Sequence, residues 1–260
     1  MPIEAVKLSG SAITTAPQAS IVPPIIGHRG AGCHAPENTL ASIRRAAVLG
    51  VRWVELDARL SRDFEVILLH DDTVDRTSDG SGLVAEKDWA ELQALDAGAW
   101  YGEAFSGARI PSLRQAITVL AELGIGANVE IKPCAGREDA TGRIVAGLLN
   151  EEWPAALPIP LISSFNLETL KAARDVAPNI PCALAVSTIP QDWREQLVEL
   201  GSNALHCDHK HISVGQVREV LDAKCALRCF TVNEADRART LYDWGVEAVF
   251  TDYPERMPMR

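Results

Sequence analysis

The sequence has no run of 18 apolar residues, no basic start followed by a continuous apolar stretch, and no Cys-x-x-Cys pair. Without the long apolar run it offers no candidate membrane-spanning helix, and without the basic and apolar start we expect no signal peptide. Basic residues are the minority, since 25 Lys and Arg face 35 Asp and Glu, a net charge of −10. Nucleic acids and anionic membranes need a basic surface, so we expect neither a nucleic-acid partner nor stable membrane association.

The cysteines are few and scattered, which argues against a disulfide framework. The six are Cys33, Cys134, Cys182, Cys207, Cys225 and Cys229. Several lie within apolar, strand-like runs, where a thiol behaves as a small hydrophobic group. Reduced thiols are typical of the cytosol, so we expect a cytoplasmic protein. The acidic balance still allows an anionic small-molecule substrate, because Arg, Lys or a metal ion can dominate a local pocket.

Short apolar runs alternate with helical patterns after Pro24. The runs predict strands at 25–28, 52–58, 127–131, 160–164, 181–186, 203–207, 226–231 and 247–251. The intervening patterns predict helices at 38–49, 112–123, 139–151, 167–176, 191–200, 214–223 and 234–244. This alternation implies a parallel sheet. Eight strands in 260 residues predict an α/β fold, the TIM (β/α)8 barrel, which commonly has about 250 residues.

The ends of the chain and of the first helix carry more local predictions. Residues 1–24 lack a regular pattern and are predicted to form an N-terminal arm, with the barrel spanning 25–260. Asn38 is a good N-cap residue and is expected to begin the first helix, with Thr39 as the alternative. Gly50 is expected to end that helix.

One apolar run, 65–69, breaks the alternation. It follows Asp57 too closely for a parallel crossover, which needs about ten residues or more. It is therefore predicted to return as a hairpin partner of the second strand, turning near Arg62-Asp63. Such pairing brings His70 back opposite Leu56, at the end of the strand that carries Asp57.

The segment 72–110 is then predicted to be a small insertion at the mouth of the barrel. It is rich in large aromatic residues, which are Trp89, Trp100, Tyr101 and Phe105. The functional interpretation is a lid or pocket wall in which Trp100 and Phe105 contact the substrate. The structural alternative is a small satellite core that anchors the insertion to the barrel.

Carboxylate side chains lie near the ends of two of the predicted strands. Glu55 and Asp57 are two residues apart and so share one side of their strand, and Glu130 lies near the end of the next barrel strand. Active sites of TIM barrels lie at the C-terminal ends of the strands. Carboxylate oxygens there bind hard divalent cations, so these three residues predict a site for one metal ion.

Two histidines and two cations are predicted to share that mouth. His28 and His70 are suited to proton transfer near neutral pH, and Arg29 and Lys132 to binding a phosphate. Taken singly, each motif also has a structural explanation, as a satisfied strand-end histidine or a salt-bridged strand end. Together they indicate metal-assisted phosphoester chemistry.

The ordered motifs resemble those of the glycerophosphodiester phosphodiesterases, of the bacterial cytoplasmic type, over about residues 25–256. The matching motifs are His28-Arg29-Gly30, Pro36-Glu37-Asn38-Thr39, Glu55-Leu56-Asp57, His70-Asp71, Arg76-Thr77, Ile110-Pro111-Ser112-Leu113, Glu130-Ile131-Lys132, Ser163-Ser164-Phe165, Thr231-Val232-Asn233 and Thr251-Asp252-Tyr253-Pro254. The resemblance implies a TIM barrel with an insertion after the second strand. It also implies metal-dependent hydrolysis of glycerophosphodiesters to glycerol 3-phosphate and an alcohol. Small departures occur at Cys33, His34 and Phe230, at the expected pocket rim.

The resemblance assigns a role to each candidate. His28 and His70 match the catalytic pair, and Arg29 and Lys132 match the phosphate-contacting positions. The remaining matches are the metal ligands Glu55, Asp57 and Glu130. The cation is expected to be Mg²⁺ or Ca²⁺, with Mn²⁺ also possible. The order of acid and base, and the choice between water and the glycerol 2-hydroxyl as nucleophile, stay open.

Two alternative functions and one unexplained motif accompany this interpretation. A phospholipase D or lysophospholipase D acting on lipid would use an exposed apolar rim. A barrel without catalysis would only bind a phosphodiester. The motif is His206-Cys207-Asp208-His209-Lys210-His211, which is compatible with a plain loop, a substrate rim or a zinc site. The zinc site is least favoured because the spacing is compressed.

Overall fold

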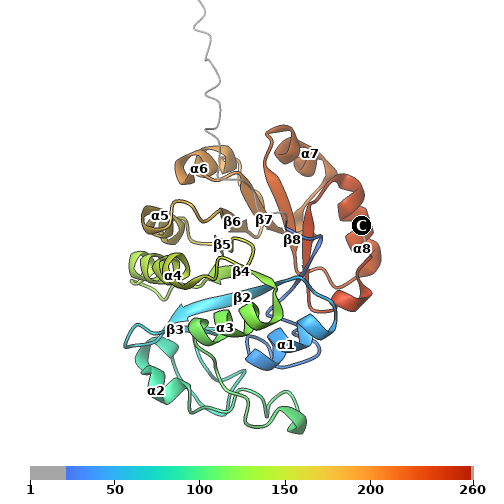
Figure 1. The fold of residues 1–260 in the computed structure, drawn as a ribbon. Helices are drawn as coiled ribbons and strands as arrows, with labels where there is room; N and C mark the ends of the chain where they lie inside the picture. The colour runs from blue at the N-terminus through green and yellow to red at the C-terminus, as the bar shows by residue number, and fades with distance from the viewer. Residues whose placement is uncertain (1–21, 259–260) are drawn as a thin grey trace, which may run out of the picture.

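The computed structural model describes residues 22–258, and its centre is a closed parallel barrel (Figure 1). The barrel strands are β1 (Ile25–Gly27), β2 (Trp53–Leu60), β4 (Gly126–Ile131), β5 (Leu161–Ser164), β6 (Cys182–Val186), β7 (Ala204–Asp208), β8 (Ala226–Phe230) and β9 (Ala248–Thr251). Each pairs with the next in parallel, and β1 pairs with both β2 and β9, which closes the ring. The predicted TIM barrel is confirmed.

Seven helices surround the barrel in the described part of the chain, apart from a short one in the insertion (Figure 1). They are α1 (Leu40–Val48), α3 (Leu113–Leu123), α4 (Glu138–Glu152), α5 (Leu167–Val176), α6 (Trp193–Leu200), α7 (Val214–Asp222) and α8 (Ala235–Trp244). Local sequence sets their ends. Capping boxes begin α3 at Ser112 and α7 at Ser213, and Gly124 ends α3 in the left-handed conformation. All predicted strands and helices are present within two residues of the expected bounds.

The predicted hairpin is also confirmed. β3 (Val66–Leu68) pairs antiparallel with β2, with Ala58 opposite Leu68. The backbone N–H of Leu69 donates to the carbonyl of Asp57 at 3.0 Å, a distance typical of backbone hydrogen bonds between strands. Continuing this register places His70 opposite Leu56, so the hairpin delivers the histidine to the mouth of the barrel.

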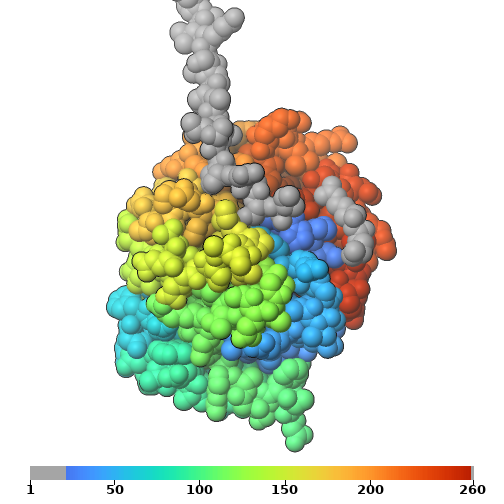
Figure 2. Space-filling model, viewed as in Figure 1, coloured from blue at the N-terminus to red at the C-terminus, as the bar shows by residue number. Residues whose placement is uncertain are grey.

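The predicted insertion, 72–110, contains short helices and a small core of its own. Its elements are η1 (Val84–Glu86), α2 (Trp89–Leu92) and η2 (Glu103–Phe105). The core is formed by Ile67, Leu69, Val74, Val84, Leu92, Ala97 and Ile110. In the space-filling view this segment, coloured teal to green, forms the lower edge of the molecule (Figure 2). A satellite core therefore exists, but it is built mainly from aliphatic residues.

The N-terminal side of the barrel is closed by residues that precede β1. Most of the predicted arm, 1–21, lies outside the described residues, but 22–24 pack against the barrel. Val22 is buried in a cluster with Ile26 and Trp53, and the carbonyl of Pro24 accepts a hydrogen bond from the Val249 backbone at 2.9 Å. Over the described range, none of the helices has the length and apolar character needed to cross a bilayer.

The N-cap of α1 is the alternative residue, Thr39, and not Asn38. Thr39 is the N-cap, and its hydroxyl accepts from the backbone N–H of Ser42 at 3.2 Å. Asn38 instead has a positive φ of 56°, a conformation that Asn tolerates better than most residues. Its side chain is thereby directed away from the helix and toward Asp57, which gives Asn38 a role in the site.

Candidate active site

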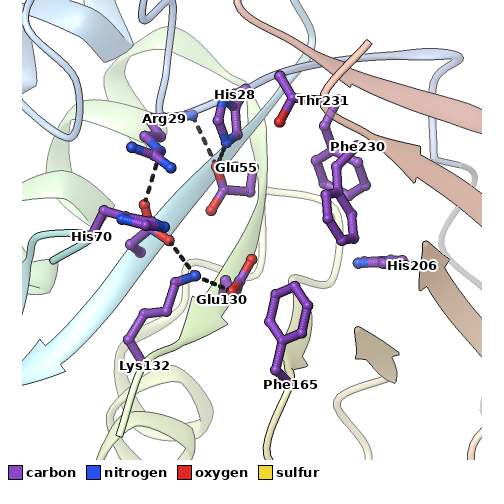
Figure 3. Close-up of a pocket in the computed structure, with 12 residues that line it drawn as sticks. His28, Arg29, Glu55, His70, Glu130, Lys132, Phe165, His206, Phe230 and Thr231 are labelled. Atoms are coloured by element: carbon purple, nitrogen blue, oxygen red, sulfur yellow. Dashed lines mark hydrogen bonds and ion pairs between the residues drawn. The ribbon is translucent and has the colours of Figure 1, made fainter. Parts of the chain in front are cut away.

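A cavity of about 170 Å³ opens at the C-terminal ends of the barrel strands (Figure 3). Its lining residues are His28, Arg29, Glu55, Asp57, His70, Glu130, Lys132, Phe165, His206, Phe230, Thr231 and Phe250. The seven charged or ionisable residues predicted at the strand ends are all among them. The other five, mainly aromatic, come from β7 to β9 and from the end of β5. The cavity therefore has a charged side and a largely apolar side.

Three carboxylates converge on the charged side. Glu55 and Asp57 lie on one face of β2, and Asp57 is level with Glu130 in the register of β2 and β4. One oxygen from each of the three lies within 4.8 Å of the others. Glu55 and Asp57 are buried, and the Glu55 Oε1 atom has no hydrogen-bond partner among the described residues. An orphaned carboxylate oxygen in such a group fits a site for a divalent cation.

The electrostatics of the trio show that negative charge is incompletely balanced. Burial, followed by repulsion from Asp57 and Glu130, raises the pKa of Glu55 well above its usual range. Burial would also raise the pKa of Asp57, but the charges of Lys132 and Arg29 outweigh it and lower that pKa to about 2. The surroundings therefore stabilise the anionic form of Asp57 and disfavour the anionic form of Glu55.

The positively charged side chains of Lys132 and Arg29 lie beside these carboxylates. The Lys132 Nζ atom lies 3.4 Å from Asp57 Oδ1 and also contacts Glu130. The Arg29 Nε atom lies 3.4 Å from Asp57 Oδ2, and the Arg29 backbone N–H donates to Glu55 Oε2 at 2.9 Å. The turn after His28 that places Arg29 there needs Gly30, since a Cβ at that position would lie 2.3 Å from the Ser42 hydroxyl.

The two histidines are oriented in the same way. The His28 Nδ1 atom lies 2.7 Å from Asp252 Oδ1, and His70 Nδ1 lies 2.7 Å from Asp71 Oδ1. Because a carboxylate can only accept a hydrogen bond, Nδ1 carries a proton in each ring, and Nε2 is available for proton transfer. The Asn233 side chain holds Asp252 in turn at 2.8 Å. His28 Nε2 lies 4.0 Å from Glu55 Oε2, beside the carboxylate group.

An ion-pair network ties the segment after β3 to the loop after β1. Arg76 donates to Asp71 at 2.6 Å and to Glu37 at 2.8 Å, and Glu37 also accepts from Arg29 at 2.7 Å. His70 and Arg29 are thereby positioned by one connected set of charges. The motifs that contain Glu37, Arg76, Asp252 and Asn233 were visible in the sequence, but their contacts were not.

Comparison with known proteins identifies the family. Residues 28–256 match the model of the glycerophosphoryl diester phosphodiesterase family. The chain belongs to this family. The matched range contains every charged residue of the pocket, and the expectation that the chain is a phosphoric diester hydrolase is confirmed with the family.

Relatives match over most of their length. YhdW of Bacillus subtilis (strain 168), provisionally named a glycerophosphodiester phosphodiesterase, is 35% identical over 242 residues, which cover 89% of this chain and 95% of that protein. A glycerophosphodiester phosphodiesterase of Caldanaerobacter subterraneus subsp. tengcongensis is 31% identical, covering 90% and 95%. The structure of an Oleispira antarctica phosphodiesterase in complex with the product sn-glycerol-3-phosphate has a TM-score of 0.88 and 41% identity, covering 90% and 95%.

The aromatic side of the phosphodiesterase pocket differs from the expectation. Trp100 and Phe105 do not line the cavity. They pack edge-to-face against Tyr101, with ring centroids 5.6 and 5.4 Å apart, and Trp100 is exposed. The rings that line the pocket are those of Phe165, Phe230 and Phe250. A substrate contact by Trp100 or Phe105 stays a prediction.

The residues 206–211 divide between the pocket and its surroundings. His206 is buried and lines the cavity, whereas His209 accepts from Arg237 through its backbone carbonyl and His211 is exposed. Within the described range, the carboxylate trio is the only group of three or more His, Cys, Asp or Glu residues placed to hold a metal ion. The zinc alternative therefore finds no support.

Asn38 provides a test of how the carboxylates are supported. Its Nδ2 donates to Asp57 Oδ2 at 2.8 Å, and its Oδ1 accepts from the Asp57 backbone N–H at 3.0 Å. Asn38→Ala is expected to weaken binding of the activating cation by roughly 10- to 100-fold, the usual range for a residue that orients a metal ligand. Isothermal titration with Mn²⁺ measures this directly.

The neighbouring residue supplies the control. Thr39→Ala removes the cap of α1 and should lower stability by about 0.5–2 kcal/mol while leaving the affinity for Mn²⁺ unchanged. Equal loss of affinity in both variants would mean that Asn38 acts only through the start of the helix.

Proposed function

We propose that this chain hydrolyses glycerophosphodiesters to glycerol 3-phosphate and an alcohol, assisted by one divalent cation. The observation that carries this proposal is a single pocket in which three carboxylates, two histidines and two cations converge. The Oleispira structure supports it, because a 41% identical phosphodiesterase binds sn-glycerol-3-phosphate as its product.

The cation would be held by Glu55, Asp57 and Glu130. Their oxygens suit Mg²⁺, Ca²⁺ or Mn²⁺, and the buried Glu55 carboxylate lacks a compensating partner at Oε1. When bound, such an ion stabilises negative charge on phosphoryl oxygens and lowers the pKa of a coordinated hydroxyl. Substrate oxygens and water would complete its coordination.

The phosphate is proposed to bind between Arg29 and Lys132. Both are largely buried and both lie 3.4 Å from Asp57, so their positions are fixed before substrate arrives. Charge-assisted hydrogen bonds from preorganised cations are stronger than those from mobile surface residues. The pair is therefore suited to the charge that develops on the phosphorus centre.

His28 and His70 are proposed to move the protons. Each keeps its Nδ1 proton against a carboxylate at 2.7 Å, so Nε2 is the reactive atom. At Nε2 one ring, in its neutral form, takes the proton of the attacking hydroxyl, and the other ring, in its doubly protonated form, gives its Nε2 proton to the leaving alcohol. Burial is the main cause that lowers the pKa of His70, which keeps that ring available in its neutral form at pH 7.

A lipid substrate is less well supported by the surface. Eight large apolar side chains are exposed in the described part of the chain, and only Phe165 among them lines the pocket. A phospholipase D or lysophospholipase D would need a continuous apolar rim for acyl chains. A purely binding role is disfavoured too, because every group expected to do the chemistry faces the cavity. The cytoplasm is proposed as the compartment, since all six cysteines are free thiols.

Product analysis tests the proposed function. Incubation with glycerophosphocholine and Mg²⁺ is expected to release glycerol 3-phosphate and choline, identified by mass spectrometry. Lysophosphatidylcholine should be cleaved far more slowly. Release of glycerol and phosphocholine, or preference for the lysolipid, would contradict the proposed substrate or the proposed bond.

A further inference from the structure

The apolar side of the pocket contains one buried imidazole whose role is not explained by the proposed chemistry. His206 lies on β7, is 2% exposed and lines the cavity. Its ring packs against Phe250, with centroids 4.9 Å apart. In the close-up it lies beside the rings of Phe230 and Phe165, facing the space that they enclose (Figure 3). A polar ring in such surroundings needs hydrogen-bond partners.

One nitrogen of the ring has a partner that fixes the proton. Arg228 is level with His206 in the register of β7 and β8, and its Nη1 atom lies 3.3 Å from His206 Nε2. A guanidinium can only donate, so Nε2 is the acceptor and the ring proton is on Nδ1. Glu247 holds Arg228 at 2.8 Å. Burial, reinforced by the charge of Arg228, lowers the pKa of His206 well below its usual range.

The other nitrogen is left as a donor. No hydrogen bond of the described residues involves His206 Nδ1, although nearly all buried polar groups in proteins are satisfied. The ring is uncharged and the donor faces a cavity with phenyl walls. A neutral hydroxyl oxygen matches this donor better than a charged group would, because the walls cannot solvate charge.

The position of β7 in the barrel determines which part of a bound substrate would lie near His206. Around the closed ring, β7 is four strands from β2 in either direction, so it is diametrically opposite the strand that carries Glu55 and Asp57. The phosphorus centre belongs beside β2 and β4, where Arg29 and Lys132 lie. We therefore expect His206 to face the end of the substrate that is remote from phosphorus.

We propose that His206 donates a hydrogen bond from Nδ1 to the terminal hydroxyl of the glycerol moiety and thereby selects glycerol esters among phosphodiesters. The inference rests on the proposed function, because it needs glycerol in the pocket. The phenyl rings would cover the carbon skeleton of glycerol, and the leaving alcohol would face the open mouth. His206 is then a residue of substrate choice, separate from the proton-transferring pair.

Two substrates and three variants test this inference. The first substrate is glycerophosphocholine, and the second is the choline phosphodiester of propane-1,2-diol esterified at its 1-hydroxyl. The second lacks only the terminal hydroxyl and keeps the 2-hydroxyl, a possible nucleophile. Wild-type enzyme should favour the first by about tenfold in kcat/KM. This ratio corresponds to the net free energy of one neutral hydrogen bond near the upper end of its usual range.

The variants decide whether His206 causes that preference. His206→Phe removes the donor at similar volume and should reduce the ratio of the two kcat/KM values to near one. His206→Asn keeps an amide donor and an acceptor for Arg228, so it should restore part of the ratio. His211→Phe alters an exposed histidine that follows the same strand and should leave the ratio at its wild-type value. The ratio is insensitive to a general loss of activity, which a merely structural role would produce.

Three results would overturn the inference. They are a wild-type ratio near one, an unchanged ratio in His206→Phe, and an equal fall in His211→Phe. If His206→Phe does not fold, a wild-type ratio near one still overturns the inference, and a partial fall of the ratio in His206→Asn supports it. All of these outcomes leave the proposed function intact, since glycerol 3-phosphate would still be released from glycerophosphocholine. Its absence with wild-type enzyme would contradict the proposed function itself.

Discussion

Replacing His28 or His70 by alanine is expected to lower kcat by about 10²-fold or more, with the fold and the affinity for the divalent cation unchanged. Both rings are held by carboxylates through Nδ1, and neither belongs to the carboxylate group suited to a metal ion. Loss of a positioned acid or base typically costs 10²- to 10⁴-fold. Steady-state kinetics and Mn²⁺ titration of each variant provide the measurement.

The control for this prediction is a histidine outside the pocket. His211→Ala should retain wild-type kcat, because His211 is exposed and does not line the cavity. A near-normal kcat in either pocket variant would remove that histidine from the chemistry. A fall in cation affinity that matches the fall in kcat would instead mean that the ring supports the metal site.

Replacing Glu55 by glutamine is expected to have two opposite effects. Activity should fall by roughly 10²- to 10³-fold, since an electrostatic group of the site is lost. The metal-free protein should become more stable, because burial and the neighbouring carboxylates disfavour the Glu55 anion. A pKa raised by folding stabilises the protein below the unfolded pKa, and that contribution is lost as pH rises through the folded pKa. At pH 7, which is above the ordinary pKa of a glutamate, that stabilisation is partly or wholly lost, whereas the uncharged glutamine side chain does not lose it.

Calorimetry without and with Mg²⁺ measures the stability effect. Each kcal/mol gained corresponds to about 2–4 °C in Tm for a domain of this size, and added Mg²⁺ should stabilise the wild type much more than the variant. Glu122→Gln is the matched control, because it neutralises an exposed surface carboxylate that is paired with Arg44. A lower Tm for metal-free Glu55→Gln, with the control unchanged, would show that the anion stabilises the fold.

The fold could be predicted from the sequence because the signals are local and repeated. Each barrel strand is a short apolar run that ends in polar residues, and each helix has its own ends marked by residues such as Ser112 and Gly124. Spacing alone identified the hairpin, since 65–69 follows Asp57 too closely for a crossover. The carboxylates could be placed together for the same reason, because side chains two apart on one strand share a face and adjacent strands share a register.

The contacts that support the site could not be predicted in this way. Asp252 is 224 residues from the histidine that it holds, and no spacing rule joins them. The positive φ of Asn38, which turns its amide toward Asp57, is a tertiary effect that overrides its preference for a cap. Phe250 lies within the predicted strand 247–251, and only the closed barrel places it on the pocket wall.

The most direct test of the central claim is the rate at which glycerol 3-phosphate appears from glycerophosphocholine before and after treatment with EDTA. We expect steady release with Mg²⁺ present, loss of release after chelation, and recovery to differing degrees when Mg²⁺, Mn²⁺ or Ca²⁺ is restored. Full-rate release of glycerol 3-phosphate by the chelated protein would contradict a metal-assisted mechanism and leave Glu55, Asp57 and Glu130 with a different task.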